Sequence, residues 1–133
     1  MEAEGVQLFY IMLFTNKEKS AIVRVAVEMQ GADGKDDVKE YLLNAAVFQK
    51  FHIGNAEIDN AKCISLLEAL STIASMATEE KDFISAFLGS LIVVDGHIDD
   101  KEMTLWKFIS TICGFPTMNI QTAIERFQQY MAK

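Results

Sequence analysis

The chain has 133 residues, half of them hydrophobic, and its 19 acidic and 12 basic side chains give a formal net charge of −7. This length suits a single domain over residues 1–133 that buries roughly two-thirds of the surface of its unfolded chain, so folding requires neither a disulfide nor a metal. The acidic balance argues against nucleic acid as a partner, because phosphate binding depends on clustered Lys and Arg. An acidic surface suits cations or a basic protein partner. The high hydrophobic content leaves room for a homodimer interface.

The start of the chain does not resemble a membrane segment. Its most apolar run, residues 6–14, is too short to span a bilayer and follows an acidic stretch where a signal peptide would be basic. We therefore expect a cytoplasmic protein without a membrane span. Cys63 and Cys113 stand alone, without metal-ligand spacing, and are expected to be small buried hydrophobes.

The sequence repeats itself at a shift of about 62 residues without a gap, which is the kind of long-period similarity that marks a duplication. We predict internal repeats at about 4–65 and 66–128. Identical residues at this shift include the pairs Leu8 and Leu70, Ile11 and Ile73, Ile22 and Ile84, Asp33 and Asp95, Gly34 and Gly96, Asp37 and Asp99, Glu40 and Glu102, and Leu43 and Leu105.

The duplication decides one ambiguous segment. Residues 23–29 alternate apolar and polar side chains, which taken alone favours a strand. The matching residues 85–91 continue a helical spacing from Ile84 through Phe87 to Leu91, so both segments are predicted to be helical. We expect an all-α, single compact bundle of about seven helices, near residues 4–14, 16–31, 37–52, 56–76, 78–94, 99–113 and 118–131.

The helix at 78–94 is apolar nearly all round, which predicts a central place in the bundle. Thr78 is expected to cap it, and Gly89 and Ser90 to allow close approach by a neighbouring helix. The helix at 99–113 is predicted to end at Gly114, before Pro116, and to bury a stripe made of Leu105, Phe108, Ile109 and Ile112.

Trp106 lies one position off this stripe and is expected to be half exposed, as a core-edge residue or a partner contact. His52 ends an apolar segment and is expected to close its helix.

Two acidic turns, residues 94–102 and 32–40, connect these helices and are the candidate site. Their structural interpretation is a helix cap: Asp99 and Glu102 form a capping box, with Ile98 and Met103 as a hydrophobic staple. Asp37 and Glu40 repeat the box in the first half. The glycines Gly34 and Gly96 fit the left-handed residue that closes a preceding helix.

The aspartates Asp33 and Asp95 do not fit that interpretation, because a carboxylate is disfavoured at a helix C-terminus. Two carboxylates about 5 Å apart repel by roughly 3 kcal/mol at an effective dielectric near 20, which calls for a compensating proton, base or cation. A hard divalent ion such as Ca²⁺, Mg²⁺ or Mn²⁺, or Lys39 or Lys101, would supply that charge. The spacing does not match an EF-hand, and carboxylates alone fit zinc poorly.

A duplicated helical chain with an Asp-Gly-x-[Ile/Val]-x-x-x-Glu turn in each half resembles the TerB-like family, which includes the tellurite-resistance protein TerB and the N-terminal region of the co-chaperone DjlA. The first half departs from this pattern, since Asp36 stands where the second half has Ile98. The resemblance implies a bundle of about seven helices and, in some members, a divalent-cation site built from both turns. Carried over by position, the site residues are Asp33, Glu40, Asp95 and Glu102, with Asp37 and Asp99 as nearby candidates.

The sequence favours a protein without enzymatic activity. His97 is a lone turn histidine with no Ser or Cys at a nucleophile spacing, and no phosphate-binding glycine loop occurs. The first hypothesis is a TerB-like cation-binding protein that acts in a stress response. A metal-free module that binds a protein partner on the same fold is the alternative, and a metal-dependent hydrolase is a distant third.

Overall fold

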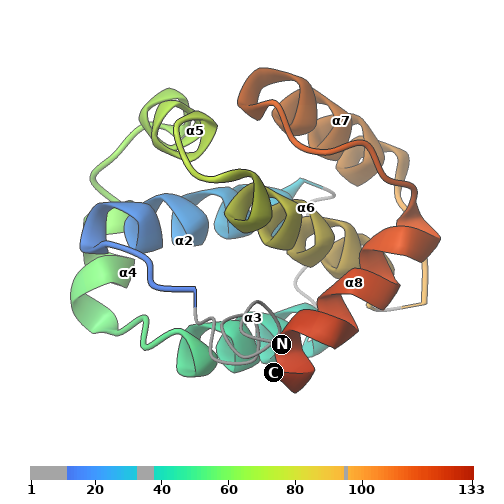
Figure 1. Ribbon diagram of the computed structural model, residues 1–133, viewed down its shortest axis with the longest axis horizontal. Coiled ribbons are helices and arrows are strands. Elements are labelled where there is room, and N and C mark those ends of the chain that lie inside the picture. Colours follow the sequence, from blue (N-terminus) through green and yellow to red (C-terminus); the bar gives the residue numbers. More distant parts are fainter. Residues whose placement is uncertain (1–11, 33–37, 95) are drawn as a thin grey trace, which may run out of the picture.

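The computed structural model describes residues 12–32, 38–94 and 96–133, and the regular secondary structure of this part of the chain is all helix, without a strand. It is the all-α architecture that the sequence predicts (Figure 1). No helix in these ranges is both long enough and apolar enough to cross a bilayer. The seven helices are α2 (Asn16–Gly31), α3 (Val38–Lys50), α4 (Asn55–Ala61), α5 (Leu66–Ala74), α6 (Thr78–Val93), α7 (Asp100–Cys113) and α8 (Ile120–Ala132).

Helix α6 occupies the middle of the bundle, as its apolar composition predicts. It packs against α8, α7 and α2, while α2 also packs against α4 and α5, and α5 packs against α7. In Figure 1, α2 and α6 cross the centre of the molecule, with α5 and α7 on one side and α3 on the other. Ten consecutive residues of α6, from Phe83 to Ile92, are buried.

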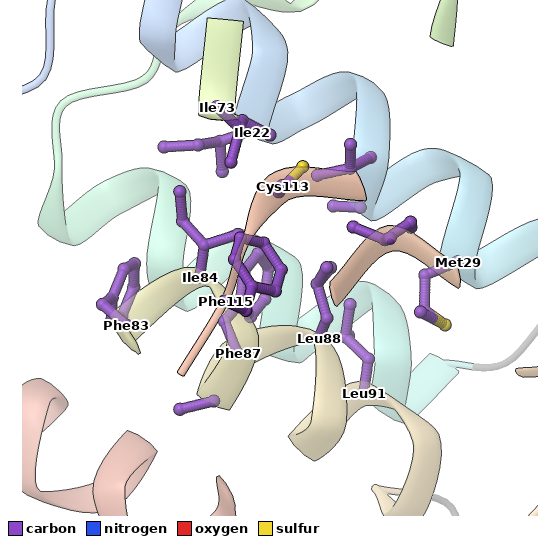
Figure 2. Packing of buried hydrophobic residues seen from close by; sticks show 14 of the residues in the cluster. Ile22, Met29, Ile73, Phe83, Ile84, Phe87, Leu88, Leu91, Cys113 and Phe115 are labelled. Carbon is purple, nitrogen blue, oxygen red and sulfur yellow. The ribbon is translucent and has the colours of Figure 1, made fainter. Parts of the chain in front are cut away.

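The core is built around the side chains of α6. Figure 2 shows Ile84 and Leu88 pointing into a space shared with Ile22, Ile73 and Cys113. An aromatic group extends the core toward the end of α3 and toward α8: the ring of Phe83 lies 4.9 Å from that of Phe51 and 6.3 Å from that of Phe127, measured between centroids. Each buried aromatic or aliphatic side chain of this size contributes about 1.5–3 kcal/mol to folding, so this cluster is the main source of stability.

Helices α2 and α6 begin in closely similar ways. In α2, the Thr15 hydroxyl accepts from the Glu18 amide (3.1 Å) and the Glu18 carboxylate accepts from the Thr15 amide (2.9 Å), which is a complete capping box. In α6, the Glu80 carboxylate accepts from the Ala77 amide at the same 2.9 Å. Ala77 has no hydroxyl, so the start of α6 has only half of the box.

Three predicted boundaries are wrong. The segment 56–76 is two helices, because Ser65 starts α5 by accepting from the Glu68 amide (3.1 Å) and so interrupts the expected long helix. Ala77, rather than Thr78, is the residue before the first turn of α6. Residues 12–15 are not helical, and the rest of the helix expected at 4–14 lies outside the described residues.

The residues that end α3 and α7 also correspond in the two halves. Gly114 has a φ of +69° and follows α7, as predicted, and the Phe115 amide donates to the Ser110 carbonyl (3.0 Å). At the end of α3, the Ile53 amide donates to the Phe48 carbonyl (2.8 Å) across the same number of residues. These matches support the internal duplication, which stays a prediction.

Candidate functional site

The second acidic turn is a tight connection between α6 and α7. Gly96 has a φ of +82°, the left-handed conformation predicted for it, and its amide donates to the Val93 carbonyl at 2.9 Å. A side chain at this position would be strained by the backbone conformation, although no atom lies within 4 Å of where its β-carbon would be. Glycine is therefore required here by conformation and not by space.

Asp99 caps α7, as the sequence predicts. Its Oδ1 atom accepts from the amides of Lys101 (2.8 Å) and Glu102 (3.2 Å). Both amides bind the same carboxylate oxygen, so the cap does not use Oδ2. Ile98, the expected staple residue, remains 53% exposed.

Glu102 and Glu40 are the most unusual residues of the two turns, because each carboxylate side chain is buried in the protein. Both are 1% exposed, and both lie in the first turn of their helices, α7 and α3. Acidic side chains are rarely buried to this extent, since removing a carboxylate from water costs several kcal/mol unless other interactions compensate. The inner faces of these two helix starts therefore carry acidic side chains, whereas most of the buried residues are apolar.

The buried face of α7 differs from the predicted stripe. It consists of Glu102, Trp106, Ile109 and Cys113, whereas Phe108 and Ile112 are 52% and 48% exposed. The predicted stripe placed apolar residues inward and excluded Glu102, so the expected orientation of the helix was off by about one position. The corresponding face of α3 buries Glu40, Asn44 and Val47.

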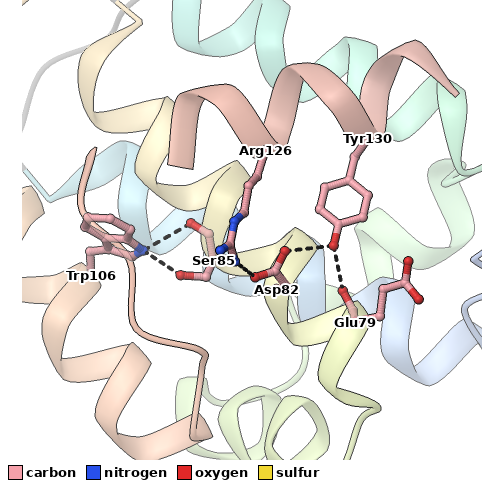
Figure 3. Close-up of polar contacts among 6 residues, drawn as sticks. All are labelled: Glu79, Asp82, Ser85, Trp106, Arg126 and Tyr130. Carbon is pink, nitrogen blue, oxygen red and sulfur yellow. Dashed lines mark hydrogen bonds and ion pairs between the residues drawn. The ribbon is translucent and has the colours of Figure 1, made fainter. Parts of the chain in front are cut away.

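Trp106 is part of the core and not a half-exposed contact residue. It is 4% exposed, and its indole nitrogen donates to the Ser85 carbonyl (3.1 Å) and hydroxyl (3.3 Å), as Figure 3 shows. The ring fits because α6 has Gly89 beneath it: a β-carbon there would lie 2.8 Å from the ring and 2.7 Å from the β-carbon of Ala123. Gly89 thus has the close-approach role that the sequence predicts.

A second polar group, which the sequence analysis missed, connects α6 to α8. The Asp82 carboxylate forms an ion pair with Arg126 and accepts from the Tyr130 hydroxyl (2.8 Å) (Figure 3). Burial and the bond to Asp82 raise the pKa of Tyr130 above its ordinary value. Asp82 lies more than 40 residues before Arg126 and Tyr130 in the sequence, and no local pattern suggested that it contacts them.

The structure describes only three of the six predicted metal ligands. Glu40, Asp99 and Glu102 lie in the described ranges, and Asp99 and Glu102 are joined through the cap of α7. Asp33, Asp37 and Asp95 lie outside the described residues. Within residues 12–32, 38–94 and 96–133, no three or more His, Cys, Asp or Glu side chains form a group that could hold a metal ion. A complete site would therefore need the aspartates of the two turns.

The two cysteines have different environments. Cys113 is buried, as predicted, and its thiol donates to the Leu70 carbonyl at a sulfur–oxygen distance of 3.5 Å. Burial raises the pKa of the Cys113 thiol to about 11, which makes it a poor nucleophile at neutral pH. Cys63 is exposed, so the prediction that it is buried is wrong.

No protein-family model matches this chain, and no curated protein matches it. Among solved structures, it is similar to a crystal structure of the protein of unknown function PG1108 from Porphyromonas gingivalis W83. The two share 36% sequence identity with a TM-score of 0.76, over 88% of this chain and 99% of the other. At this identity and coverage the similarity extends beyond the fold, and the chain belongs to the same protein family as PG1108.

Proposed function

We propose that this protein is a non-enzymatic, TerB-like cation-binding protein, in which the two acidic turns together hold one divalent ion. The observation that carries the proposal is the burial of Glu40 and Glu102 at matching positions in the first turns of α3 and α7. An apolar residue would cost less on either inner face, so a buried carboxylate in both halves favours a role in binding.

The available donors suit a hard cation. Glu40 and Glu102 supply carboxylate oxygens from the protein side, and the Oδ2 atom of Asp99, which the helix cap does not use, is a further donor. Asp33, Asp37 and Asp95 belong to the same turns in the sequence. An all-oxygen set fits Ca²⁺, Mg²⁺ or Mn²⁺ and fits zinc poorly. The resemblance to TerB supports the same cation class and suggests a role in a stress response.

The test is thermal denaturation of protein freed of metal by a chelator and then titrated with Ca²⁺, Mg²⁺ and Mn²⁺. Metal at a hundred times its dissociation constant should add about 2.7 kcal/mol to the free energy of unfolding. The variants Glu102→Gln and Glu40→Gln, which keep the size of the side chain and remove its charge, should lose most of this gain.

A matched control is Glu68→Gln, since Glu68 also lies in the first turn of a helix but is exposed. It should keep the full metal-dependent gain. The comparison uses the difference between metal-free and metal-loaded protein, so a general loss of stability in a variant does not imitate the effect. Absence of a gain in the parent protein, or an unchanged gain in both buried-glutamate variants, would rule out the cation site.

The alternative function is a metal-free module that binds a protein partner, and one observation favours it. Helix α3 exposes Val38, Tyr41 and Leu42, which are 74%, 66% and 60% exposed, on a single outer surface. Exposed apolar groups of this kind are common at protein interfaces. Because Trp106 is buried, this surface of α3 replaces it as the expected contact. If no cation stabilises the protein, a partner search should compare the parent chain with Tyr41→Ser.

A further inference from the structure

A cavity of about 360 Å³ is lined by residues of the segment before α2, the start of α2, the end of α3 and the end of α8. It lies away from the acidic turns. Lys50, which lines it, is ten residues after Glu40 on α3, and this separation is about 15 Å along a helix axis. The volume falls within the usual range of small-molecule pockets, about 300–1,000 Å³.

The cavity is cationic, although the protein as a whole is acidic. Three lysines line it, Lys19, Lys50 and Lys133, together with His52, and no Asp or Glu is among its described lining residues. The chain carries a net charge of −7, so this grouping is the reverse of its average composition. Glu79 is nearby, outside the lining, and its carboxylate lies 4.0 Å from the Lys133 ammonium. The lysines at this opening therefore favour an anion.

The remaining lining is apolar and largely aromatic. Phe14 is 8% exposed, and its ring lies 5.2 Å from that of Phe51 in an edge-to-face arrangement, measured between centroids. The Tyr130 ring also lines the cavity, and the Lys133 ammonium lies 5.0 Å from its centroid. The Tyr130 hydroxyl is bound to Asp82, so Tyr130 offers the cavity mainly the face of its ring. The pocket thus combines a positively charged rim with an apolar wall.

The backbone conformation of His52 supports a functional role for this cavity. It has a φ of +57° and is the only described residue other than glycine with a positive φ. Gly114, which has a φ of +69°, occupies the matching position after α7. A left-handed conformation costs a non-glycine residue about 1–2 kcal/mol, and such strain collects at functional sites. The His52 carbonyl also accepts from the Lys19 ammonium at 3.2 Å, which holds Lys19 at the rim.

We propose that this pocket binds a small amphiphilic anion, a single carboxylate attached to an apolar body. The lysine ammonium groups bind the carboxylate at the rim, and the apolar body lies against Phe14, Phe51 and Tyr130. A neutral apolar molecule would leave the lysines without a counter-charge, and a small inorganic anion would leave the aromatic wall in contact with water. This inference goes beyond the cation site and is independent of it, since the two sites share no residue.

The first experiment is calorimetric titration of the full chain with hexanoate, octanoate and decanoate, each below its micelle concentration. Saturable binding is expected, and affinity should rise by up to about fourfold for each added methylene that is buried. Binding should weaken with added salt, because the interaction is between charges near the surface. Decanol has the same chain without the charge and should bind at least about tenfold more weakly. Equal binding of decanol and decanoate would overturn the proposal.

The second experiment uses Lys50→Gln/Lys133→Gln, which removes two of the rim charges. Its affinity for decanoate should fall by about tenfold or more, since a hydrogen bond to a charged group contributes at least this factor. Lys62→Gln is the matched control, because Lys62 is an exposed lysine outside the pocket, and it should bind within about twofold of the parent. Both lysines of the double variant lie at the rim of an open site, so circular dichroism should show an unchanged fold.

A third arm distinguishes two sources of the same ligand chemistry. Short peptides that end in leucine are titrated in two forms, one with a free C-terminal carboxylate and one with an amidated C-terminus. Tighter binding of the free-acid peptide than of octanoate would assign the pocket to a polypeptide carboxylate, and the reverse order would assign it to a free alkyl acid. No saturable binding of either class, or unchanged affinity in the lysine variant, would show that the pocket does not bind this class of ligand.

Discussion

At the scale of single residues, His52 shows how a local conformation can be fixed by the surrounding structure against the preference of the side chain. Its amide donates to the Gln49 carbonyl (3.3 Å) and the next amide, of Ile53, donates to the Phe48 carbonyl (2.8 Å), which is the Schellman pattern that ends a helix. The pattern places a left-handed residue at position 52. Glycine satisfies this requirement after α7, and histidine adopts it after α3.

Replacing His52 by glycine should therefore stabilise the protein. His52→Gly removes the strain of the left-handed conformation, about 1–2 kcal/mol, and adds a glycine entropy cost in the unfolded chain of about half that size. We expect a net gain of about 0.5–1 kcal/mol in the free energy of unfolding, measured by urea denaturation. The contact of Lys19 with the backbone carbonyl of residue 52 is retained. Gly114→Ala is the reverse control and should lose at least about 1 kcal/mol, so a loss on both substitutions would contradict this account.

At the scale of helices, the starts of α2 and α6 differ in the side chain of the cap residue, which has a hydroxyl in Thr15 and none in Ala77. Both have a glutamate that binds the amide of the residue before the helix, at 2.9 Å in each case. The backbone of Ala77, with φ −68° and ψ 153°, is close to that of Thr15, with φ −69° and ψ 165°. Only the side chain of Thr15 completes the box.

A threonine at position 77 should therefore complete the box at the start of α6. Ala77→Thr is expected to raise the free energy of unfolding by about 1 kcal/mol, and Thr15→Ala to lower it by a similar amount. Ala77 is exposed, so the added atoms meet no core side chain. Chemical denaturation of the two single variants and the double variant measures both effects. If Ala77→Thr changed nothing while Thr15→Ala destabilised, the two helix starts would not be equivalent.

Much of the helix order followed from the sequence because duplicated patterns reinforce each other. The repeat assigned residues 23–29 to a helix although their alternation favoured a strand, and α2 covers them. The long helix at 56–76 was wrong because apolar spacing continues through Ser65, whose capping bond interrupts it. A side chain that caps a helix leaves no trace in hydrophobic periodicity.

The candidate site was less predictable, for a physical reason. Hydrophobic spacing assumes that the inner face of a helix is apolar, and α7 buries Glu102 there together with Trp106. The sequence identified Glu40, Asp99 and Glu102 as special through the acidic motif but did not predict that the glutamates are buried. The cationic pocket was not predicted, because its residues come from the ends of three helices and share no local pattern.

At the scale of the whole molecule, the charged groups are arranged unevenly. The acidic turns follow α2 and α6, and the lysine-rich cavity gathers the start of α2 with the ends of α3 and α8. Two helices, α2 and α3, therefore each connect an acidic region to a basic one. The two proposed ligands, a divalent cation and an amphiphilic anion, would bind in different regions of one small bundle.

The buried titratable groups predict a loss of stability at alkaline pH. The pKa of Cys113 is about 11 in the folded protein and 9.0 in its unperturbed state, and the pKa of Tyr130 is also raised. Between these values the unfolded thiol loses its proton while the folded thiol keeps it, so the unfolded state binds fewer protons and stability falls as pH rises. Cys113 should contribute a fall of up to about 2–3 kcal/mol between pH 9 and pH 11.

Urea denaturation at several pH values between 8 and 11 measures this slope. The variant Cys113→Ala should be less stable than the parent at pH 8, because it removes a buried sulfur, but its stability should fall less steeply above pH 9. Tyr130→Phe should likewise flatten the slope at the upper end of the range. Slopes identical to that of the parent in both variants would show that these two groups do not control the alkaline transition.

Because Gly89 lacks a β-carbon, residues of three helices, α6, α7 and α8, share one packing space. The Trp106 ring of α7 and the Ala123 methyl group of α8 fill the space that a side chain on α6 would otherwise need. Among relatives of this chain, a larger residue at position 89 can be accommodated only by a smaller ring at 106 or by the loss of the methyl group at 123. Evolution should therefore change these three residues in concert, so that their summed size stays constant while each one varies.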